Sequence, residues 1–285
     1  MTTAILPSQA SSDAALIDLW LAGRPENTAA AYRLDATRFL AHVAKPLAAV
    51  TVGDLHTFAA HLAAQGVRPT SQRRPLAAVK SLLTFGVAVG YLRVNVGTVV
   101  KLRRSKDTLG ERILSEADIH RIINLETDPR NAALLRLLYA TGGRVSEVCR
   151  LTWRDVVWRD RGEAQVTLYG KGDKTRVVWL PASVGRDLRR LRGSADADAP
   201  VFASRHGGTL SRAQVWRVVK AAALRAGIEA SPSPHWFRHA HVSHALDRGA
   251  PAHLVQTTVG HASLDTTTGY SHARPNESSA KYLAL

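Results

Sequence analysis

Tyr270 stands in the stretch VGHASLDTTTGYSHARP, near the C-terminal end of the sequence, where it is either a packed aromatic residue or a nucleophile. A tyrosine hydroxyl has a pKa near 10, so only about one in a thousand is ionised at neutral pH. A nucleophilic tyrosine therefore needs neighbours that activate it or stabilise its transition state. His261, which precedes Tyr270 by nine residues, is a first candidate.

Arg144 follows two glycines and opens a predicted helix in ATGGRVSEVCRL. At a helix start, the guanidinium and the unpaired backbone N–H groups could face the same anion. Glu147 lies one turn later and could orient the arginine. A surface ion pair between these two residues is the alternative.

His235 and Arg238 in SPHWFRHAHVSHAL are spaced i and i+3, which places both on one helix face. An imidazole beside a guanidinium could transfer a proton while the arginine binds two oxygens of an anion. Zinc and a helix that satisfies its histidines in the core are alternatives, because more histidines follow in the same segment. A zincin-type helix, however, has glutamate after its first histidine, and here that residue is Trp236. The further histidines are His239, His241 and His244.

Lys171 lies in GKGDKTR, a predicted turn whose glycines would let the loop reach over a substrate. The spacing of a nucleotide-binding loop is absent, and no dinucleotide-binding glycine motif follows a strand. The sequence therefore predicts no nucleotide cofactor, and it favours a site without metal. Two arginines, two histidines and a lysine around one phosphodiester would suit phosphoryl transfer to or from a tyrosine.

The elements that must position these residues are mainly helical. The first hundred residues predict a small helical domain, with a capping box at Thr51 and Asp54, a helix stop at Gly66 and Pro75 in the first turn of another helix. The second half predicts helices around a small antiparallel sheet, whose strands are VVWRDRG, EAQVTLYG and TRVVWLP. Ser115 is the predicted cap of its first helix. Later helices are predicted over residues 182–192, 211–226, 234–247, 251–259 and 263–272.

The composition points to a polyanionic partner. Lys and Arg number 38 against 23 acidic residues, a net charge of +15, and both halves of the chain are basic. The single cysteine, Cys149, excludes an internal disulfide and a zinc site built from several thiolates. The chain shows no membrane-spanning run and no signal peptide, so we expect a cytoplasmic protein. A merely basic protein without such a partner is the alternative.

In their order along the chain, these motifs resemble those of the tyrosine site-specific recombinases, the phage integrase and Xer-type family. The resemblance covers residues 13–285 and is carried by ATGGRVSEVCRL, GKGDKTR, PHWFRHAHVSHAL and VGHASLDTTTGYSH. It implies a mainly α-helical fold: an N-terminal helical core-binding domain of four to five helices (1–98), a basic linker (99–112) and a mostly helical catalytic domain with a small antiparallel sheet (113–285). The linker is either a solvated connection or a strap along phosphates.

The resemblance also implies roles for the site residues. Tyr270 would attack a DNA phosphate to form a 3′-phosphotyrosyl link, and Arg144 and Arg238 would hold the non-bridging oxygens. Lys171 would protonate the leaving 5′ oxygen, and His235 would assist as an acid or base. The remaining implied roles are a phosphate contact from His261, support of Arg144 by Glu147, and DNA contacts from Lys101, Arg103, Arg104, Lys106, Arg73 and Arg74.

Such a site would exchange strands between two DNA duplexes in a tetrameric synapse, without a cofactor or a metal ion. The protein would act at the nucleoid in the cytoplasm. A need for a partner recombinase or accessory factor is left open.

Two departures from the family pattern are Gly143, where a larger apolar residue is usual, and Phe237 in place of leucine. The alternatives are a type IB topoisomerase and a DNA-binding regulator without catalysis. The segment SAKYLAL could dock on a neighbouring subunit or fold back on its own. The sequence does not reveal the DNA site or the biological task.

Overall fold

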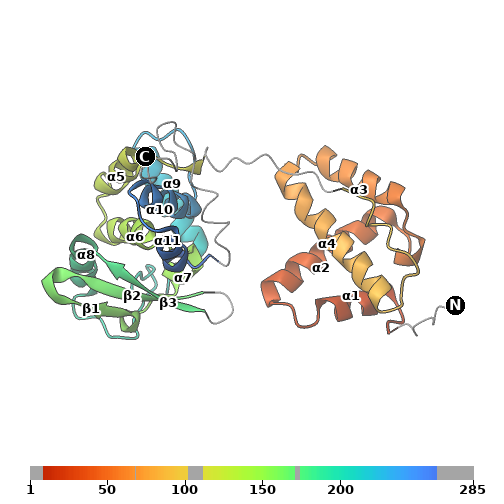
Figure 1. The fold of residues 1–285 in the computed structure, drawn as a ribbon, viewed down its shortest axis with the longest axis horizontal. Coiled ribbons are helices and arrows are strands. Elements are labelled where there is room, and N and C mark those ends of the chain that lie inside the picture. Colours follow the sequence, from red (N-terminus) through yellow and green to blue (C-terminus); the bar gives the residue numbers. More distant parts are fainter. Residues whose placement is uncertain (1–8, 68, 102–111, 171–173, 262–285) are drawn as a thin grey trace, which may run out of the picture. The chain divides into compact units, whose positions relative to one another are not determined.

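The chain is described by a computed structural model that covers residues 9–67, 69–101, 112–170 and 174–261. It divides into two compact units, Met1–Lys106 and Asp107–Leu285 (Figure 1). Each unit has its own hydrophobic core. In the described part of the chain no helix is long and apolar enough to cross a membrane.

The N-terminal unit is built from helices packed around aromatic residues. Phe39 and Phe58 are fully buried and meet edge to face, with ring centroids 5.2 Å apart. The capping box is confirmed: Thr51 Oγ1 accepts from the Asp54 N–H, and Asp54 Oδ2 accepts from the Thr51 N–H at 2.7 Å. The helices are α1 (Asp13–Leu21), α2 (Glu26–Val43), η1 (Leu47–Ala49), α3 (Val52–Ala64) and α4 (Pro69–Ala88).

Pro75 lies inside α4 and not in its first turn, so this prediction was wrong. The helix begins six residues earlier, at Pro69, although an interior proline costs about 3 kcal/mol. Burial offsets that cost, because each fully buried aliphatic side chain contributes about 1.5–3 kcal/mol. Pro75 itself is buried, and Val79, Leu82 and Leu83 behind it are at most 1% exposed.

The C-terminal unit is mostly helical around a three-stranded antiparallel sheet of order β1-β2-β3, which confirms the predicted fold class. Ser115 caps the first helix, as predicted, by accepting from the Asp118 N–H at 3.1 Å. The predicted helix over 263–272 lies outside the described residues. The elements are α5 (Glu116–Asn124), α6 (Pro129–Thr141), α7 (Val145–Cys149), η3 (Trp153–Asp155), β1 (Val156–Trp158), η4 (Asp160–Gly162), β2 (Ala164–Tyr169), β3 (Thr175–Leu180), α8 (Ala182–Arg192), α9 (Arg212–Arg225), α10 (Pro234–Asp247) and α11 (Ala252–Val259).

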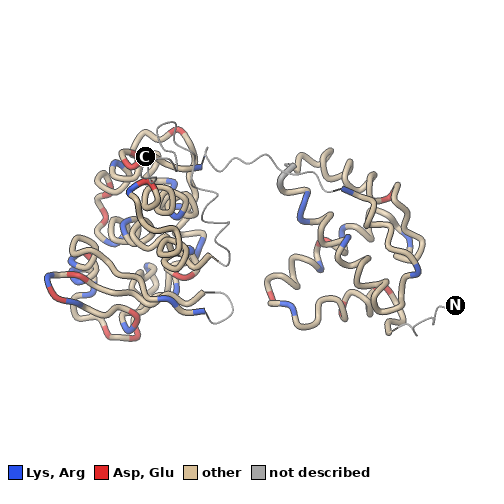
Figure 2. The backbone as a smooth tube through the Cα atoms, in the orientation of Figure 1, with Lys and Arg blue, Asp and Glu red and all other residues tan. Residues whose placement is uncertain are grey.

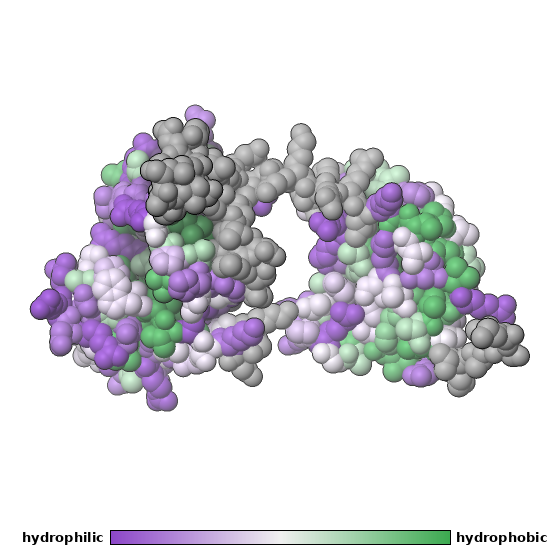
Figure 3. Space-filling view, in the orientation of Figure 1, coloured by the Kyte–Doolittle hydropathy of each residue, from purple (hydrophilic) through white to green (hydrophobic). Residues whose placement is uncertain are grey.

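The β2–β3 hairpin carries the lysine turn. Its register pairs Tyr169 with Thr175, and the Gly170 N–H donates to Lys174 O at 2.8 Å. The inner face of the sheet is buried, whereas Trp179 on the outer face is 53% exposed. Figure 3 likewise shows hydrophobic residues among hydrophilic ones on the face in view of each unit. The hairpin therefore has one face in the core and one in solvent.

The turn from α6 to Arg144 needs its first glycine. Gly142 ends α6 with φ of +54°, in the left-handed region that glycine adopts without strain. A Cβ atom at this position would lie 2.8 Å from Val259 Cγ1 and 2.9 Å from His241 Cδ2. The glycine thus lets α6 end in close contact with α10 and α11.

Gly185→Ala is expected to destabilise the C-terminal unit. A Cβ at this position of α8 would lie only 2.2 Å from the backbone oxygen of Gly162. Because backbone atoms must shift, we expect a loss of about 2–3 kcal/mol. That loss corresponds to a melting temperature lower by roughly 4–12 °C. Tryptophan fluorescence can follow the transition, since five of the six tryptophans lie in this unit.

Gly208→Ala is the matched control, because its new Cβ would meet only Ser204 Oγ, at 4.0 Å. Equal melting temperatures for Gly185→Ala and Gly208→Ala would contradict the close packing of α8 on η4.

Candidate active site

α7 begins next to Arg144, but the local N–H groups are used differently from the prediction. The Arg144 N–H donates to Glu147 Oε2 at 2.8 Å, and the Gly143 N–H donates to Thr141 Oγ1 at 3.0 Å. These two N–H groups are therefore occupied within the protein, so they do not face an anion together with the guanidinium. The guanidinium of Arg144 stays accessible, with 41% of its side chain exposed.

Gly143 fits closely among its neighbours at the start of this helix. A Cβ atom here would lie 3.0 Å from Thr141 Oγ1, 3.2 Å from Val148 Cγ2 and 3.3 Å from Leu168 Cδ1. Neighbouring side chains therefore already fill the space that a larger apolar residue would need. Phe237, the other departure from the family pattern, is fully buried in the core of the unit.

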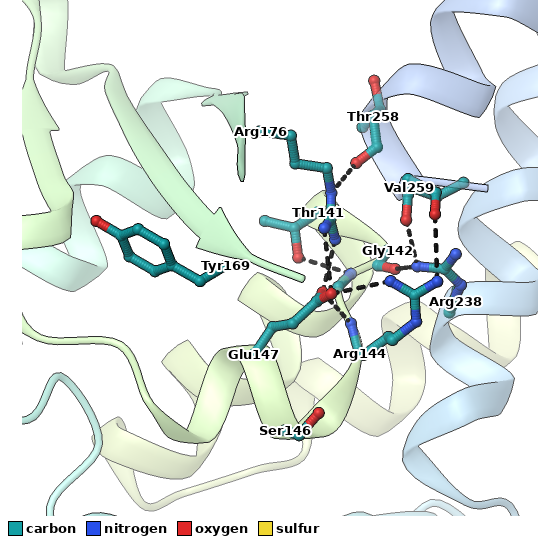
Figure 4. A network of polar contacts seen from close by, with 12 residues as sticks. Thr141, Gly142, Arg144, Ser146, Glu147, Tyr169, Arg176, Arg238, Thr258 and Val259 are labelled. Atoms are coloured by element: carbon teal, nitrogen blue, oxygen red, sulfur yellow. Dashed lines mark hydrogen bonds and ion pairs between the residues drawn. The ribbon is translucent and has the colours of Figure 1, made fainter. Parts of the chain in front are cut away.

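Glu147 is buried between two arginines, so the alternative of a surface ion pair does not hold. Arg144 Nη1 donates to its Oε1 at 2.9 Å, and Arg176 Nη2 from β3 donates to its Oε2 at 2.6 Å (Figure 4). The Glu147 side chain is only 1% exposed. Burial alone raises the pKa of Glu147, but hydrogen bonds from Arg176 and Arg144 outweigh burial and hold that pKa below its usual value.

The end of α11 gathers three arginines. Thr258 O accepts from Arg176 Nε at 2.7 Å, Val259 O from an arginine of α10 at 2.7 Å, and Gly260 O from Arg144 Nη2 at 3.2 Å. The last carbonyls of a helix lack partners within the helix and carry partial negative charge, so cations stabilise them. Three consecutive carbonyls thus hold guanidinium groups that come from α10, β3 and the start of α7.

The α10 arginine is Arg238, which is 2% exposed. Its Nη1 donates to Gly142 O and to Val259 O, both at 2.7 Å (Figure 4). A single guanidinium therefore joins the end of α6 to the end of α11. Since Gly142 is two residues before Arg144, this contact also positions the start of α7.

His235 and His261 belong to the same electrostatic cluster. The ring of His235 packs edge to face on His239, with centroids 4.4 Å apart, while the residue stays exposed to solvent. Desolvation, followed by the charges of Arg238 and Arg144, lowers the pKa of His235. The same causes lower the pKa of His261 to about 4. Both imidazoles are therefore neutral at pH 7, and each can donate one hydrogen bond and accept another.

The remaining histidines of α10 have protein partners. His241 Nδ1 lies 2.8 Å from Tyr139 O, and His244 Nδ1 lies 2.9 Å from the Tyr139 hydroxyl. Burial lowers the pKa of His239, which is 7% exposed, to about 4. In the described part of the chain, no group of three His, Cys, Asp or Glu side chains could hold a metal ion.

These histidines predict a pH-dependent stability. Burial, followed by the charges of Arg238 and His244, lowers the pKa of His241 to about 4 in the folded protein, against about 6.5 when unfolded. Between these pH values the unfolded chain binds more protons. Stability is therefore fully present above about pH 6.5 and falls as the pH drops towards 4, by up to about 1.4 kcal/mol per pH unit for each such histidine.

The check is urea unfolding between pH 5 and 7 in wild type and His241→Asn. The asparagine amide can still donate to Tyr139 O, but it does not titrate. The stability of this variant should therefore vary less steeply with pH than that of wild type. Identical slopes in the two proteins would contradict a neutral, half-buried His241.

The structure thus brings together Arg144, Glu147, His235, Arg238 and His261. Of the predicted DNA contacts, Lys101 and Arg73 are exposed, whereas Arg74 donates to the buried carboxylate of Asp35 at 2.7 Å. The other predicted site residues lie outside the described residues: Lys171, Tyr270, Arg103, Arg104 and Lys106.

Similarity to known proteins identifies the chain. A model of the phage integrase family matches residues 112–277, and a model of the phage integrase N-terminal SAM-like domain matches residues 16–90. Tyrosine recombinase XerD of Mycobacterium leprae is 33% identical over 307 aligned positions, covering 95% of this chain and 94% of that protein. The chain belongs to the phage integrase family. XerD of Vibrio cholerae, at 31% identity, also covers 95% of this tyrosine recombinase.

Solved structures share the fold of this phage integrase family member. XerA recombinase is 26% identical, and the alignment covers 91% of this chain and 92% of the XerA chain, with a TM-score of 0.52. A lambda integrase dimer bound to a COC′ core site has a TM-score of 0.74 at 18% identity, with 93% and 97% of the two chains covered. XerH bound to its difH substrate has a TM-score of 0.73 at 20% identity, with 96% and 84% covered.

Arg176 is the residue of this tyrosine recombinase site that the sequence interpretation missed. It stands in GKGDKTR, five residues after Lys171, and its side chain is only 9% exposed. The available signal was weak: a cation at an inward-facing place in a predicted strand, where an apolar residue is usual. Such a residue needs a buried anion, and the sequence alone does not identify Glu147 as that anion.

Proposed function

We propose that this phage integrase family member cuts and rejoins DNA at specific sites through a 3′-phosphotyrosyl intermediate on Tyr270. It would exchange strands between two duplexes without ATP or metal. The observation that carries this proposal is the cluster at the end of α11, where Arg144, Arg238, His235 and His261 meet. These residues come from three separate segments of the chain, and His261 precedes Tyr270 by nine residues.

The electrostatics of the cluster suit a phosphodiester. The cluster contains three guanidinium groups and one carboxylate, so it has a net positive charge even with its histidines neutral. Guanidinium groups bind two non-bridging oxygens of a phosphate at once, and preorganised donors of this kind are each worth about 10²–10³ in rate. Lys and Arg residues are distributed along the backbones of both units (Figure 2), and the whole chain has a net charge of +15.

In the proposed cleavage step, the Tyr270 oxygen forms a bond to phosphorus and the bond to the 5′ oxygen breaks. His235, neutral because of its lowered pKa, takes part in removing the phenol proton. Lys171 gives a proton to the leaving oxygen, and Arg144, Arg238 and His261 hold the non-bridging oxygens. The new bond conserves the energy of the phosphodiester, so the reverse step can rejoin a strand.

We extend the proposal to the assembly. The solved relatives include a lambda integrase tetramer bound to a Holliday junction. A tetrameric synapse on double-stranded DNA at the nucleoid is accordingly part of the proposal for this chain. The linker cations, including Lys101, would lie along phosphates, and exposed Arg73 would contact DNA. Arg74 would instead link α4 to α2, through Asp35.

The test is covalent attachment to a library of nicked duplexes, followed by strand exchange between two labelled duplexes that carry the selected site. Both reactions should proceed in EDTA and without ATP. A second arm adds host extract, which tests whether a partner recombinase or accessory factor is needed.

Relaxation of a supercoiled circle without exchange between duplexes would instead assign a type IB topoisomerase. Specific DNA binding without a covalent adduct on any member of the library would assign a non-catalytic regulator.

A further inference from the structure

The carboxylate of Glu147 accepts four hydrogen bonds, two from each of two arginines. Arg144 donates from its backbone N–H to Oε2 at 2.8 Å and from Nη1 to Oε1 at 2.9 Å. Arg176 donates from Nη2 to Oε2 at 2.6 Å and from Nη1 to Oε1 at 3.2 Å. A carboxylate has about four lone-pair sites, so this group is saturated.

The two arginines differ in how much of each side chain is left accessible after these hydrogen bonds. Arg176 uses all three of its side-chain nitrogens, because its Nε donates to Thr258 O at 2.7 Å, and it is only 9% exposed. The Arg144 side chain is 41% exposed. Thus Arg176 is committed to the protein, while Arg144 presents a surface to a ligand. Figure 4 shows the two converging on Glu147 from different elements.

We propose that Arg176 is a positioning residue for the phosphate clamp. It holds the Glu147 carboxylate at a fixed orientation, and the carboxylate in turn holds the guanidinium of Arg144 against the scissile phosphate. Through Thr258, it also ties β3, and with it the hairpin that carries the lysine turn, to the end of α11. This inference rests on the proposed function of the site.

The packing at the end of α11 supports this role. Gly260, whose carbonyl accepts from Arg144, has φ of +68°, and a Cβ there would lie 3.3 Å from Arg176 Nη1 and 3.4 Å from its Cδ. The Arg176 side chain therefore packs directly on the backbone that holds Arg144. Loss of its planar fork would free Glu147 to rotate with Arg144, because a single carboxylate then has only one arginine partner.

Charge and position can be separated by Arg176→Lys. An ammonium group keeps the positive charge, but it lacks the rigid fork that reaches both carboxylate oxygens and the Thr258 carbonyl together. We expect this variant to form the covalent adduct about 10- to 100-fold more slowly at saturating protein, since small misplacements of a reacting group cost this much. Its affinity for the same nicked duplex should stay within about twofold of wild type, because Arg176 contacts the protein and not the DNA.

A double-mutant cycle with Glu147→Gln tests the path of the effect. If Arg176 acts through Glu147, Arg176→Lys should slow the Glu147→Gln protein by less than about threefold, and the two penalties should not multiply. Arg225→Met is the matched control, because it also takes an arginine away from a buried carboxylate. Arg225 lies at the end of α9, and its partner Glu126, whose side chain is 3% exposed, follows α5. It should lower the melting temperature and leave the rate of adduct formation by folded protein unchanged.

Three results would overturn the inference. One is a folded Arg176→Lys protein that forms the adduct at the wild-type rate. The second is a pair of penalties that multiply in the cycle, which would mean that Arg176 acts independently of Glu147. The third is a loss of DNA affinity as large as the loss of rate. Failure of the proposed function is distinct, since wild type would then form no adduct. Circular dichroism and thermal unfolding confirm that each variant is folded.

Discussion

Tyr270→Phe is expected to abolish the covalent protein–DNA adduct. The substitution removes one oxygen, which is the atom proposed to attack the phosphate, and leaves the rest of the ring. Cationic residues supply most of the affinity for DNA, so binding to the nicked duplex should remain within about twofold of wild type. Denaturing gels measure the adduct, and mobility shifts measure the affinity.

Three other tyrosines are poorer candidates for the nucleophile. A hydrogen bond to Asp155 raises the pKa of Tyr169, and burial raises that of Tyr139. Burial, followed by the hydrogen bond to Asp13, raises the pKa of Tyr91 to about 12. A raised pKa leaves less of the reactive phenolate at neutral pH.

Tyr169→Phe is the matched control for Tyr270→Phe. It makes the same chemical change at the end of β2, where the residue is 51% exposed. We expect this variant to form the adduct as wild type does. An adduct formed by Tyr270→Phe at a comparable rate would contradict the assignment of the nucleophile.

Local features of the fold could be predicted because their signals lie within a few residues. The Thr51–Asp54 capping box and the Ser115 cap each depend on a side chain and an N–H three residues away. Gly142 ends α6 in a left-handed backbone conformation, and a glycine after a helical run is a signal of the same local kind. The position of Pro75 was predicted wrongly for the opposite reason. Burial of α4 in the core outweighs the local preference of proline for the first turn of a helix.

The residue types of the site and the local Arg144–Glu147 pair could be predicted, but the partners that are distant in sequence could not. Arg144 was expected to face an anion together with nearby N–H groups, but the N–H groups of Gly143 and Arg144 are occupied, and the guanidinium also reaches Gly260 O, 116 residues away in the chain. Arg176 pairs with Glu147 across 29 residues and with Thr258 across 82. Tertiary packing brings these groups together, and no local spacing in the sequence encodes it. Resemblance to a family supplied the roles of single residues but not this network.

Replacing Arg238 is the other substitution with a large expected effect. Arg238→Met removes a buried cation and leaves Gly142 O and Val259 O without the donor that joins them. Each unsatisfied buried carbonyl costs about 1–3 kcal/mol, so we expect a loss of roughly 2–6 kcal/mol in the stability of the C-terminal unit. Urea unfolding followed by tryptophan fluorescence measures this loss. Adduct formation should also fall below detection, because the proposed phosphate clamp loses one of its two guanidinium groups.

Arg238→Lys separates the structural role from the catalytic one. An ammonium group has three donors and can still serve the two carbonyls, so most of the stability should return, to within about 1 kcal/mol of wild type. It cannot also bind two oxygens of a phosphate in the planar geometry of a guanidinium, so adduct formation should remain about 10²–10³-fold slower. Restoration of both stability and rate by lysine would show that a positive charge at this position is enough. In that case Arg238 would join α6 to α11 and neutralise the phosphate charge, without needing to bind two phosphate oxygens at once.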